Sequence, residues 1–287
     1  MRYELTGEQL KIVVDTHGAE LVSVVHNGKE QLWQNEDGSW GGHAPILFPV
    51  CGHCGLTVDG KDYPLPAHGF AKRREFTFVS REENALCFSL LSDDETTRVY
   101  PFAFRFTVRY EIEGNALKVT YAVHNPQDAP LFFSCGAHES YALEGALGDY
   151  ELVFSTPVPL VHSYHNIDGY LTGETLDLGT RQVLPLPAEL LKDDNTLILG
   201  HIAARTVRLR KKAGACVATV DFPDFAHLLL WRPKQANMIC IEPWGNLPDR
   251  LGERTPFASR EGVTRVAPYA TKTLTHTIRY GEDGRKT

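Results

Sequence analysis

The 287-residue sequence lacks several features that would place it in a familiar class of protein. It has no stretch of 18 uninterrupted apolar residues, so we expect no membrane-spanning helix. It has no long run of Lys and Arg, and its net charge is −7, from 29 basic and 36 acidic residues, so nucleic acid is not an expected partner. No basic leader followed by an apolar stretch opens the chain, and we therefore expect a cytoplasmic protein.

Several catalytic motifs are also missing. The sequence contains no Gly-Xaa-Ser-Xaa-Gly elbow, no phosphate-binding glycine loop and no dinucleotide-binding glycine pattern. Hydrolases, NTPases and nicotinamide-dependent enzymes that rely on these motifs are therefore disfavoured. We expect no cofactor.

The cysteines show no disulfide framework. They lie mostly inside apolar runs without regular spacing, which predicts reduced, buried thiols. Cys51 and Cys54 have the two-residue gap of a zinc half-site with His43 upstream, but no second Cys/His pair with ligand spacing follows. We therefore predict no metal, and a zinc protein ranks third among the functional hypotheses. The six cysteines are Cys51, Cys54, Cys87, Cys135, Cys216 and Cys240.

The sequence is rich in β-strand patterns, while helical periodicity is scarce. The clearest pattern covers residues 102–123, where apolar residues alternate on both sides of the turn Glu113-Gly114-Asn115 and predict an antiparallel hairpin. The best helix candidate, residues 185–191, is short. Further strands are predicted at 10–14, 19–25, 85–91, 131–134, 207–210, 216–220, 226–230, 238–242 and 271–280.

This pattern predicts an all-β fold. Hydrophobic residues make up 43% of the chain, enough for a large core, and no repeat or flexible linker divides it. We expect one domain over residues 1–287, a single large antiparallel β-sandwich of two packed sheets with few short helices. Residues 280–287 are charged and are expected to form a frayed tail.

Two histidines, His68 and His138, lie beside residues that are typical of a functional site. His68 precedes Gly69, which permits close approach of a backbone or ligand. His138 ends an apolar run, and if the strand continued to it, Ser134, Gly136 and His138 would share a face that could line a groove. The structural alternatives are a solvated loop histidine at 68 and a core histidine bonded to a carbonyl at 138.

Glu242 closes a predicted strand. Pro243 disfavours a helical conformation there, so the carboxylate is expected at a strand end beside apolar neighbours. Desolvation raises the pKa of such a group from about 4.3 toward values that allow proton exchange near neutrality. Trp244 offers a flat surface for the C–H face of a sugar. The alternative is a strand-end glutamate paired with an arginine such as Arg232 or Arg250.

Together these motifs resemble the aldose 1-epimerase (galactose mutarotase-like) family, and more closely its LacX-like branch, which neighbours the glucose-6-phosphate epimerases. The resemblance implies a single large β-sandwich that interconverts the α and β anomers of a cyclic aldose without metal or cofactor. It covers roughly residues 33–250 in family order. The matching segments are Trp40 with residues 44–49, then 68–71, 100–102, Asn125, 134–138, and 239–245 with Asp249.

The resemblance also implies roles for individual residues. Glu242 matches the general base, His138 the general acid, and His68 a second histidine that binds the sugar near its ring oxygen. The expected partner is a small-molecule hexose, with or without a phosphate or sulfonate group, and the chain is expected to be a monomer or weak homodimer. Further substrate contacts are expected from Trp244, from Asp194, and from Lys72 in the basic run Lys72-Arg73-Arg74.

The sequence departs from the family pattern at several positions. Relatives commonly carry arginines where Gly42, His53 and Lys72 stand. Glu139 follows His138 where an aromatic residue or proline is frequent, and it would favour the charged imidazole if it pointed toward that ring. These departures motivate the second hypothesis, a non-catalytic carbohydrate-binding or sensing protein on the same fold.

Overall fold

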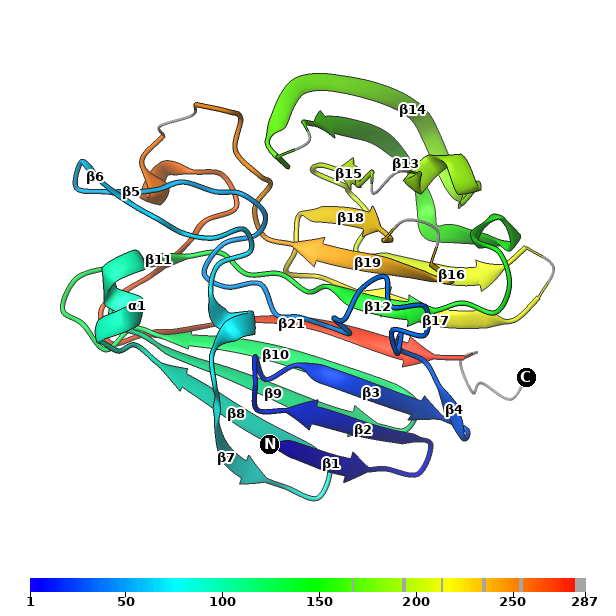
Figure 1. Ribbon diagram of the computed structural model, residues 1–287, viewed down its shortest axis with the longest axis horizontal. Coiled ribbons are helices and arrows are strands. Elements are labelled where there is room, and N and C mark those ends of the chain that lie inside the picture. The colour runs from blue at the N-terminus through cyan, green and yellow to red at the C-terminus, as the bar shows by residue number, and fades with distance from the viewer. Residues whose placement is uncertain (167, 193–194, 213, 234–235, 253–254, 282–287) are drawn as a thin grey trace.

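The structure is a computed structural model, and it describes residues 1–166, 168–192, 195–212, 214–233, 236–252 and 255–281 (Figure 1). Over these residues it consists almost entirely of antiparallel strands, with a single α-helix of 6 residues, α1 (Asp94–Val99). The largest sheet contains 13 strands. The predicted all-β fold with a large antiparallel sheet and few short helices is confirmed.

The large sheet brings together segments that are distant in sequence. Its order is β12-β19-β18-β15-β13-β16-β17-β21-β10-β9-β8-β7, with β14 paired to β13. The strands that carry the functional site, β12, β19 and β18, therefore lie at one end of the sheet. The bounds are β7 (Thr77–Arg81), β8 (Ala85–Leu91), β9 (Arg105–Glu113), β10 (Ala116–His124), β12 (Glu139–Ala142), β13 (Tyr150–His165), β14 (Leu171–Pro185), β15 (Leu197–Leu199), β16 (Thr206–Lys211), β17 (Cys216–Asp221), β18 (His227–Trp231), β19 (Met238–Trp244) and β21 (Thr271–Tyr280).

A four-stranded N-terminal sheet, β1 to β4, covers the end of the large sheet formed by β8, β9 and β10 (Figure 1). The Tyr3 ring stacks on Phe78 at 4.1 Å, and the Tyr110 hydroxyl donates to the Ala19 carbonyl at 2.7 Å. Burial of aromatic and aliphatic side chains between these layers stabilises the fold. The remaining elements are β1 (Arg2–Thr6), β2 (Leu10–Asp15), β3 (Leu21–His26), β4 (Lys29–Glu30), β5 (Leu56–Val58), β6 (Lys61–Tyr63), β11 (Leu131–Phe133), β20 (Thr264–Val266), and the 3-10 helices η1 (Ala71–Arg73), η2 (Leu147–Asp149), η3 (Ala188–Leu191) and η4 (Phe257–Ser259).

The predicted hairpin is confirmed as β9 and β10, which pair from Glu113 with Ala116. Its inward residues are buried at every second position, as the alternation predicts. The first strand begins at Arg105 rather than at residue 102, because the preceding segment leaves α1 through Pro101 and joins no ladder. The other nine predicted strand segments all overlap observed strands.

Two local expectations were met only in part. The short helix expected within residues 185–191 is present as the 3-10 helix η3, because β14 extends to Pro185. The strand predicted at 131–134 ends at Phe133 and does not continue to His138. Asp93 caps α1 by accepting the Thr96 amide at 2.7 Å.

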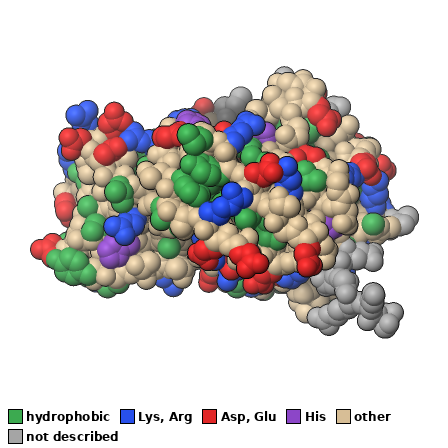
Figure 2. Space-filling view, turned by 90° about the horizontal axis from the view of Figure 1, so that it is seen from below, with side chains coloured by type: hydrophobic (Ala, Val, Ile, Leu, Met, Phe, Trp, Pro, Cys, Tyr) green, Lys and Arg blue, Asp and Glu red, His purple; other side chains and the backbone are tan. Residues whose placement is uncertain are grey.

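The frayed tail expected at residues 280–287 falls mostly outside the described residues, and the prediction was wrong at its first residue. Tyr280 is the fully buried last residue of β21, and residues 282–287 lie outside the described part of the chain. In the part of the chain that the structure describes, no helix has the length and apolar character needed to cross a membrane. On the face shown in Figure 2, acidic and basic side chains are interspersed with small apolar patches.

Candidate active site

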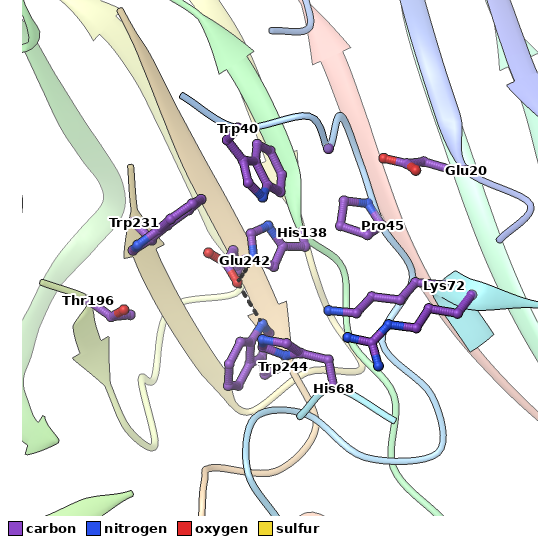
Figure 3. A pocket seen from close by; sticks show the side chains of 12 residues that line it. Glu20, Trp40, Pro45, His68, Lys72, His138, Thr196, Trp231, Glu242 and Trp244 are labelled. Carbon is purple, nitrogen blue, oxygen red and sulfur yellow. Dashed lines mark hydrogen bonds and ion pairs between the residues drawn. The ribbon is translucent and has the colours of Figure 1, made fainter. Parts of the chain in front are cut away.

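A cavity of about 410 Å³ opens beside the ends of β18 and β19 (Figure 3). This volume falls in the range of about 300–1,000 Å³ that is typical of small-molecule sites. Its walls come from the N-terminal third of the chain, the segment before β12, and the β18–β19 pair. The lining residues are Glu20, Trp40, Gly42, Pro45, His68, Lys72, Arg73, His138, Thr196, Trp231, Glu242 and Trp244.

His138 and Glu242 meet on the floor of this cavity. Glu139 of β12 pairs with Ile241 of β19, so the antiparallel register sets His138 opposite Glu242. The His138 Nε2 atom lies 3.3 Å from Glu242 Oε2, and both side chains are buried. The structure thus brings together the two residues to which the family resemblance assigns proton transfer. Glu242 contacts His138 and Trp244 rather than Arg232, whose guanidinium donates to the Ala188 carbonyl.

Burial shifts the proton affinities of both groups toward their uncharged forms. Desolvation raises the pKa of Glu242 well above its usual value, although the Trp244 indole, which donates to Oε2 at 3.1 Å, opposes the shift. Desolvation, with the Lys72 cation as a smaller cause, lowers the pKa of His138 to about 3. We infer that His138 Nε2 and Glu242 Oε2 share one proton, so that the pair carries no net charge at neutral pH.

Indole rings enclose the pair on several sides. Trp40 stacks on the His138 ring at 5.3 Å, and Trp231 meets it edge-on at 5.8 Å. Figure 3 shows Trp244 on the opposite side of Glu242 from Trp40. Trp33 lies outside the cavity lining and instead donates to the Trp40 carbonyl at 3.0 Å. These rings provide the flat apolar surfaces on which sugar C–H faces pack.

The turn at His68 fixes the orientation and tautomer of its imidazole. Its backbone amide donates to the Gly52 carbonyl at 2.8 Å, and the Gly52 amide donates to His68 Nδ1 at 3.1 Å. Nδ1 is therefore an acceptor, which leaves the ring proton on Nε2. Burial, with the Lys72 cation as a second cause, holds the pKa of His68 well below its usual value. The imidazole is a neutral hydrogen-bond donor at the cavity.

Close backbone packing explains the glycines in two of the motifs. Gly69 has φ +68°, and a Cβ there would run into the Phe48 carbonyl. A Cβ at Gly136 would lie 2.8 Å from the Cys51 sulfur and 3.0 Å from the Trp244 ring. Gly136 forms bridges with both Leu47 and Trp244, which hold the segment before His138 against β19.

One wall of the cavity is cationic. Lys72 extends from η1 toward the space between His138 and His68 (Figure 3), and Arg73 also lines the cavity. Arg74 does not, because its guanidinium pairs with Asp93 and Glu95. The basic run expected to grip a charged sugar therefore contributes two of its three residues.

Glu20 was not predicted, and it supplies a second carboxylate to the cavity wall. It accepts the backbone amides of His43 and Ala44 at 2.7 and 3.0 Å. Burial raises its pKa, but hydrogen bonds from His43 and Ala44 outweigh this effect and lower the pKa overall, so the group is charged at neutral pH. No sequence motif marks Glu20, because its position depends on how β3 packs against the segment at residues 43–44.

Two further residues named in the sequence analysis are Asp194 and Glu139. Asp194 falls outside the described residues, although Thr196, two positions later, lines the cavity. Glu139 points away from His138, and its Oε1 lies 2.8 Å from His276 Nε2 in the core, so the condition under which it would favour a charged His138 is not met. Alternation along β12 explains this orientation.

The candidate zinc half-site does not assemble. The Cys54 sulfur lies 3.0 Å from the Arg260 guanidinium, and Cys51 packs against Trp244 in an apolar cluster. Burial raises the pKa of each thiol to about 12. Among the described residues, neither cysteine joins His43 in a group of metal-binding size. None of the six cysteines forms a disulfide, as predicted, although Cys87 and Cys216 are only half-buried.

Comparison with known proteins identifies the family of this chain. The family model described as aldose 1-epimerase matches residues 1–184. Protein LacX of Lactococcus lactis subsp. lactis, in its plasmid and chromosomal forms, is 30% identical over 302 residues, which cover 97% of this chain and 99% of the relative. The chain belongs to the aldose 1-epimerase family.

Solved structures show the same architecture over the whole chain. The galactose mutarotase related enzyme from Lactobacillus acidophilus is 28% identical with a TM-score of 0.89, and the alignment covers 100% of this chain and 99% of that one. A galactose mutarotase-like protein from Lactobacillus casei ATCC 334 is 27% identical with a TM-score of 0.88, over 97% and 99% of the two chains. The predicted galactose mutarotase-like fold is thereby confirmed.

Proposed function

We propose that this protein is an aldose mutarotase that interconverts the α and β anomers of a hexose or hexose derivative. The observation that carries the proposal is the 3.3 Å contact between His138 Nε2 and Glu242 Oε2 inside a cavity of small-molecule size. Because the two atoms are adjacent and share one proton, they can serve the two adjacent oxygens of a hemiacetal.

The proposed reaction uses this pair in both directions. Glu242 removes the proton from the anomeric hydroxyl while His138 donates one to the ring oxygen. The C1–O5 bond breaks, the C1 carbonyl forms, and rotation about C1–C2 presents the other face. Reverse transfers close the ring and return the proton to His138. The pair keeps zero net charge throughout. Its reactive state, a charged Glu242 beside a charged His138, must form by proton transfer across the 3.3 Å contact from the uncharged forms that burial favours.

The surrounding residues orient the sugar in this proposal. The Nε2–H group of His68, fixed by the Gly52 contact, donates to a sugar oxygen near the ring. The indoles of Trp40, Trp231 and Trp244 pack on its apolar edges and exclude water from the proton-transfer pair.

We propose further that the cationic wall favours a hexose with an anionic substituent. Lys72 is half-buried, and burial lowers the pKa of its ammonium, with Arg73 as a second cause. A bound phosphate or sulfonate would stabilise the Lys72 ammonium, which burial and the neighbouring Arg73 cation disfavour. Glu20 lies in the same cavity, and it limits the preference to a substituent that approaches from the Lys72 side.

Anomer exchange of glucose, galactose and glucose 6-phosphate, measured by polarimetry and NMR saturation transfer, tests the proposal. We expect acceleration over the uncatalysed rate, and a preference for the phosphorylated sugar that declines at high salt. The Lys72→Gln variant should lose that preference while retaining turnover of the neutral sugars. Calorimetric binding of sugars without acceleration of any of them would instead favour the non-catalytic carbohydrate-binding hypothesis.

A further inference from the structure

A thiol lies directly beside the proposed proton-transfer pair. Cys240 precedes Glu242 by two residues on β19, so both side chains point to the same face of the sheet. The Cys240 sulfur, a His138 ring nitrogen and a Glu242 carboxylate oxygen all lie within 4.8 Å of one another. Cys240 is fully buried against Trp33 and does not line the sugar cavity. The proposed reaction uses no thiol at this position.

We propose that His138, Cys240 and Glu242 bind one zinc ion, and that the ion inhibits the enzyme by occupying both proton-transfer groups. Zinc takes nitrogen, sulfur and carboxylate oxygen ligands in tetrahedral geometry. With Zn–N and Zn–O bonds of about 2.0–2.2 Å, a tetrahedron places these two ligand atoms about 3.4 Å apart. The His138 Nε2 and Glu242 Oε2 atoms are already 3.3 Å apart, so this edge of the coordination sphere is preformed.

Charge balance favours the ion in this buried place. Zn²⁺ bound to a thiolate, a carboxylate and a neutral imidazole has no net charge, so no uncompensated charge is buried. Binding releases two protons to solvent, one from the Cys240 thiol and one shared by His138 and Glu242. The fourth coordination position faces the cavity, where water or a sugar hydroxyl completes the tetrahedron.

The same chemistry sets the selectivity of the site. Thiolate and imidazole ligands select zinc and related transition metals, whereas Mg²⁺ and Ca²⁺ prefer all-oxygen sites. The Lys72 ammonium is an opposing cation on the cavity wall, and Glu20, which also lines the cavity, partly offsets it. Cys54, by contrast, lies against the Arg260 guanidinium, which repels a metal cation.

Titration of the chelator-treated, full-length protein with Co²⁺ tests the proposal without any sugar. We expect one Co²⁺ per chain, thiolate-to-cobalt charge-transfer absorption, and displacement by Zn²⁺. Cys240→Ala should abolish that absorption and weaken Zn²⁺ binding more than about 100-fold. Loss of a residue that only hydrogen-bonds to a metal ligand typically weakens binding by about 10- to 100-fold. Cys240→Ser is close to cysteine in shape and should also abolish the absorption and weaken Zn²⁺ binding. The melting temperature of each variant shows whether it folds. Cys87→Ala, on distant β8, is the control and should bind as the wild type does.

Unchanged Co²⁺ absorption in both Cys240 variants, or no thiolate band in the wild type, would overturn the proposal. In the sugar assay, micromolar Zn²⁺ should inhibit the wild type reversibly and spare Cys240→Ala, while Mg²⁺ has no effect. The absorption experiment is independent of catalysis. A protein that bound cobalt through Cys240 but never accelerated anomer exchange would retain the metal site and refute the mutarotase proposal alone.

Discussion

The side chains of His138 and Glu242 meet because β12 and β19 are antiparallel neighbours, with Glu139 paired to Ile241. The same register turns Glu139 to the opposite face, where it contacts His276. Two adjacent residues thus face different environments, one the cavity and the other the core. This relationship separates the residues we expect to govern activity from those we expect to govern stability.

Glu139→Gln should destabilise the protein and leave its chemistry intact. The substitution replaces a charge-assisted hydrogen bond to His276 by a neutral one, and we expect a loss of about 2 kcal/mol in the free energy of unfolding. Urea denaturation measures this loss, and anomer exchange measured below the unfolding transition should stay within a few-fold of wild type. A loss of activity as large as that of a cavity variant would show that Glu139 acts on the site.

Gly69→Ala should be much more costly than a similar change in an open turn. Both Gly69 and Gly114 have positive φ, at +68° and +60°, but only Gly69 would place a Cβ against a backbone carbonyl. We expect a loss of about 1 kcal/mol in Gly114→Ala and of at least about 3 kcal/mol in Gly69→Ala. Equal melting temperatures for the two variants would contradict the close approach to Phe48.

Buried neutral histidines should make the fold sensitive to acid. Burial, with His201 as a second cause, lowers the pKa of His227 to about 3 in the folded state, while an unfolded histidine titrates near 6.5. The unfolded chain therefore binds more protons between these values, so this contribution to stability is complete above pH 6.5 and declines as the pH falls toward 3.

The His227→Asn variant isolates this contribution. It keeps an acceptor near the position of Nδ1, which receives the His201 amide at 3.1 Å, but it cannot be protonated. Between pH 7.5 and 4.5, we expect the variant to lose about 2–3 kcal/mol less than wild type in urea denaturation. Parallel pH dependence of the two proteins would place the acid sensitivity at other groups.

Strand patterns predicted much of the fold, because buried and exposed positions alternate along β8, β9, β10 and β21. The long strand β14 escaped prediction because nearly all of its residues are exposed, so no buried face appears in the sequence. The strand predicted at 131–134 ends within one residue of the expected position, but the path from Phe133 to Glu139 escaped prediction, since it depends on bridges that Gly136 makes to two distant segments. That the whole chain forms one domain remains a prediction.

Motifs identified His68, His138, Glu242 and Trp244, all of which line the cavity. Their mutual geometry could not be predicted, because strand register between distant segments is set by tertiary packing. Glu20 and Thr196 were missed for the same reason. The partner of Glu139 could not be foreseen either, since His276 lies on β21, at a distance from β12 in the strand order.

Saturation transfer between the two anomers of the preferred sugar, with wild type, Glu242→Gln and His138→Gln, tests the central claim most directly. Removing either proton-transfer group should lower the exchange rate by about 10²- to 10⁴-fold with unchanged folding. His227→Asn, which alters a buried histidine outside the cavity, should exchange at the wild-type rate. Wild-type exchange rates in folded Glu242→Gln would contradict the account.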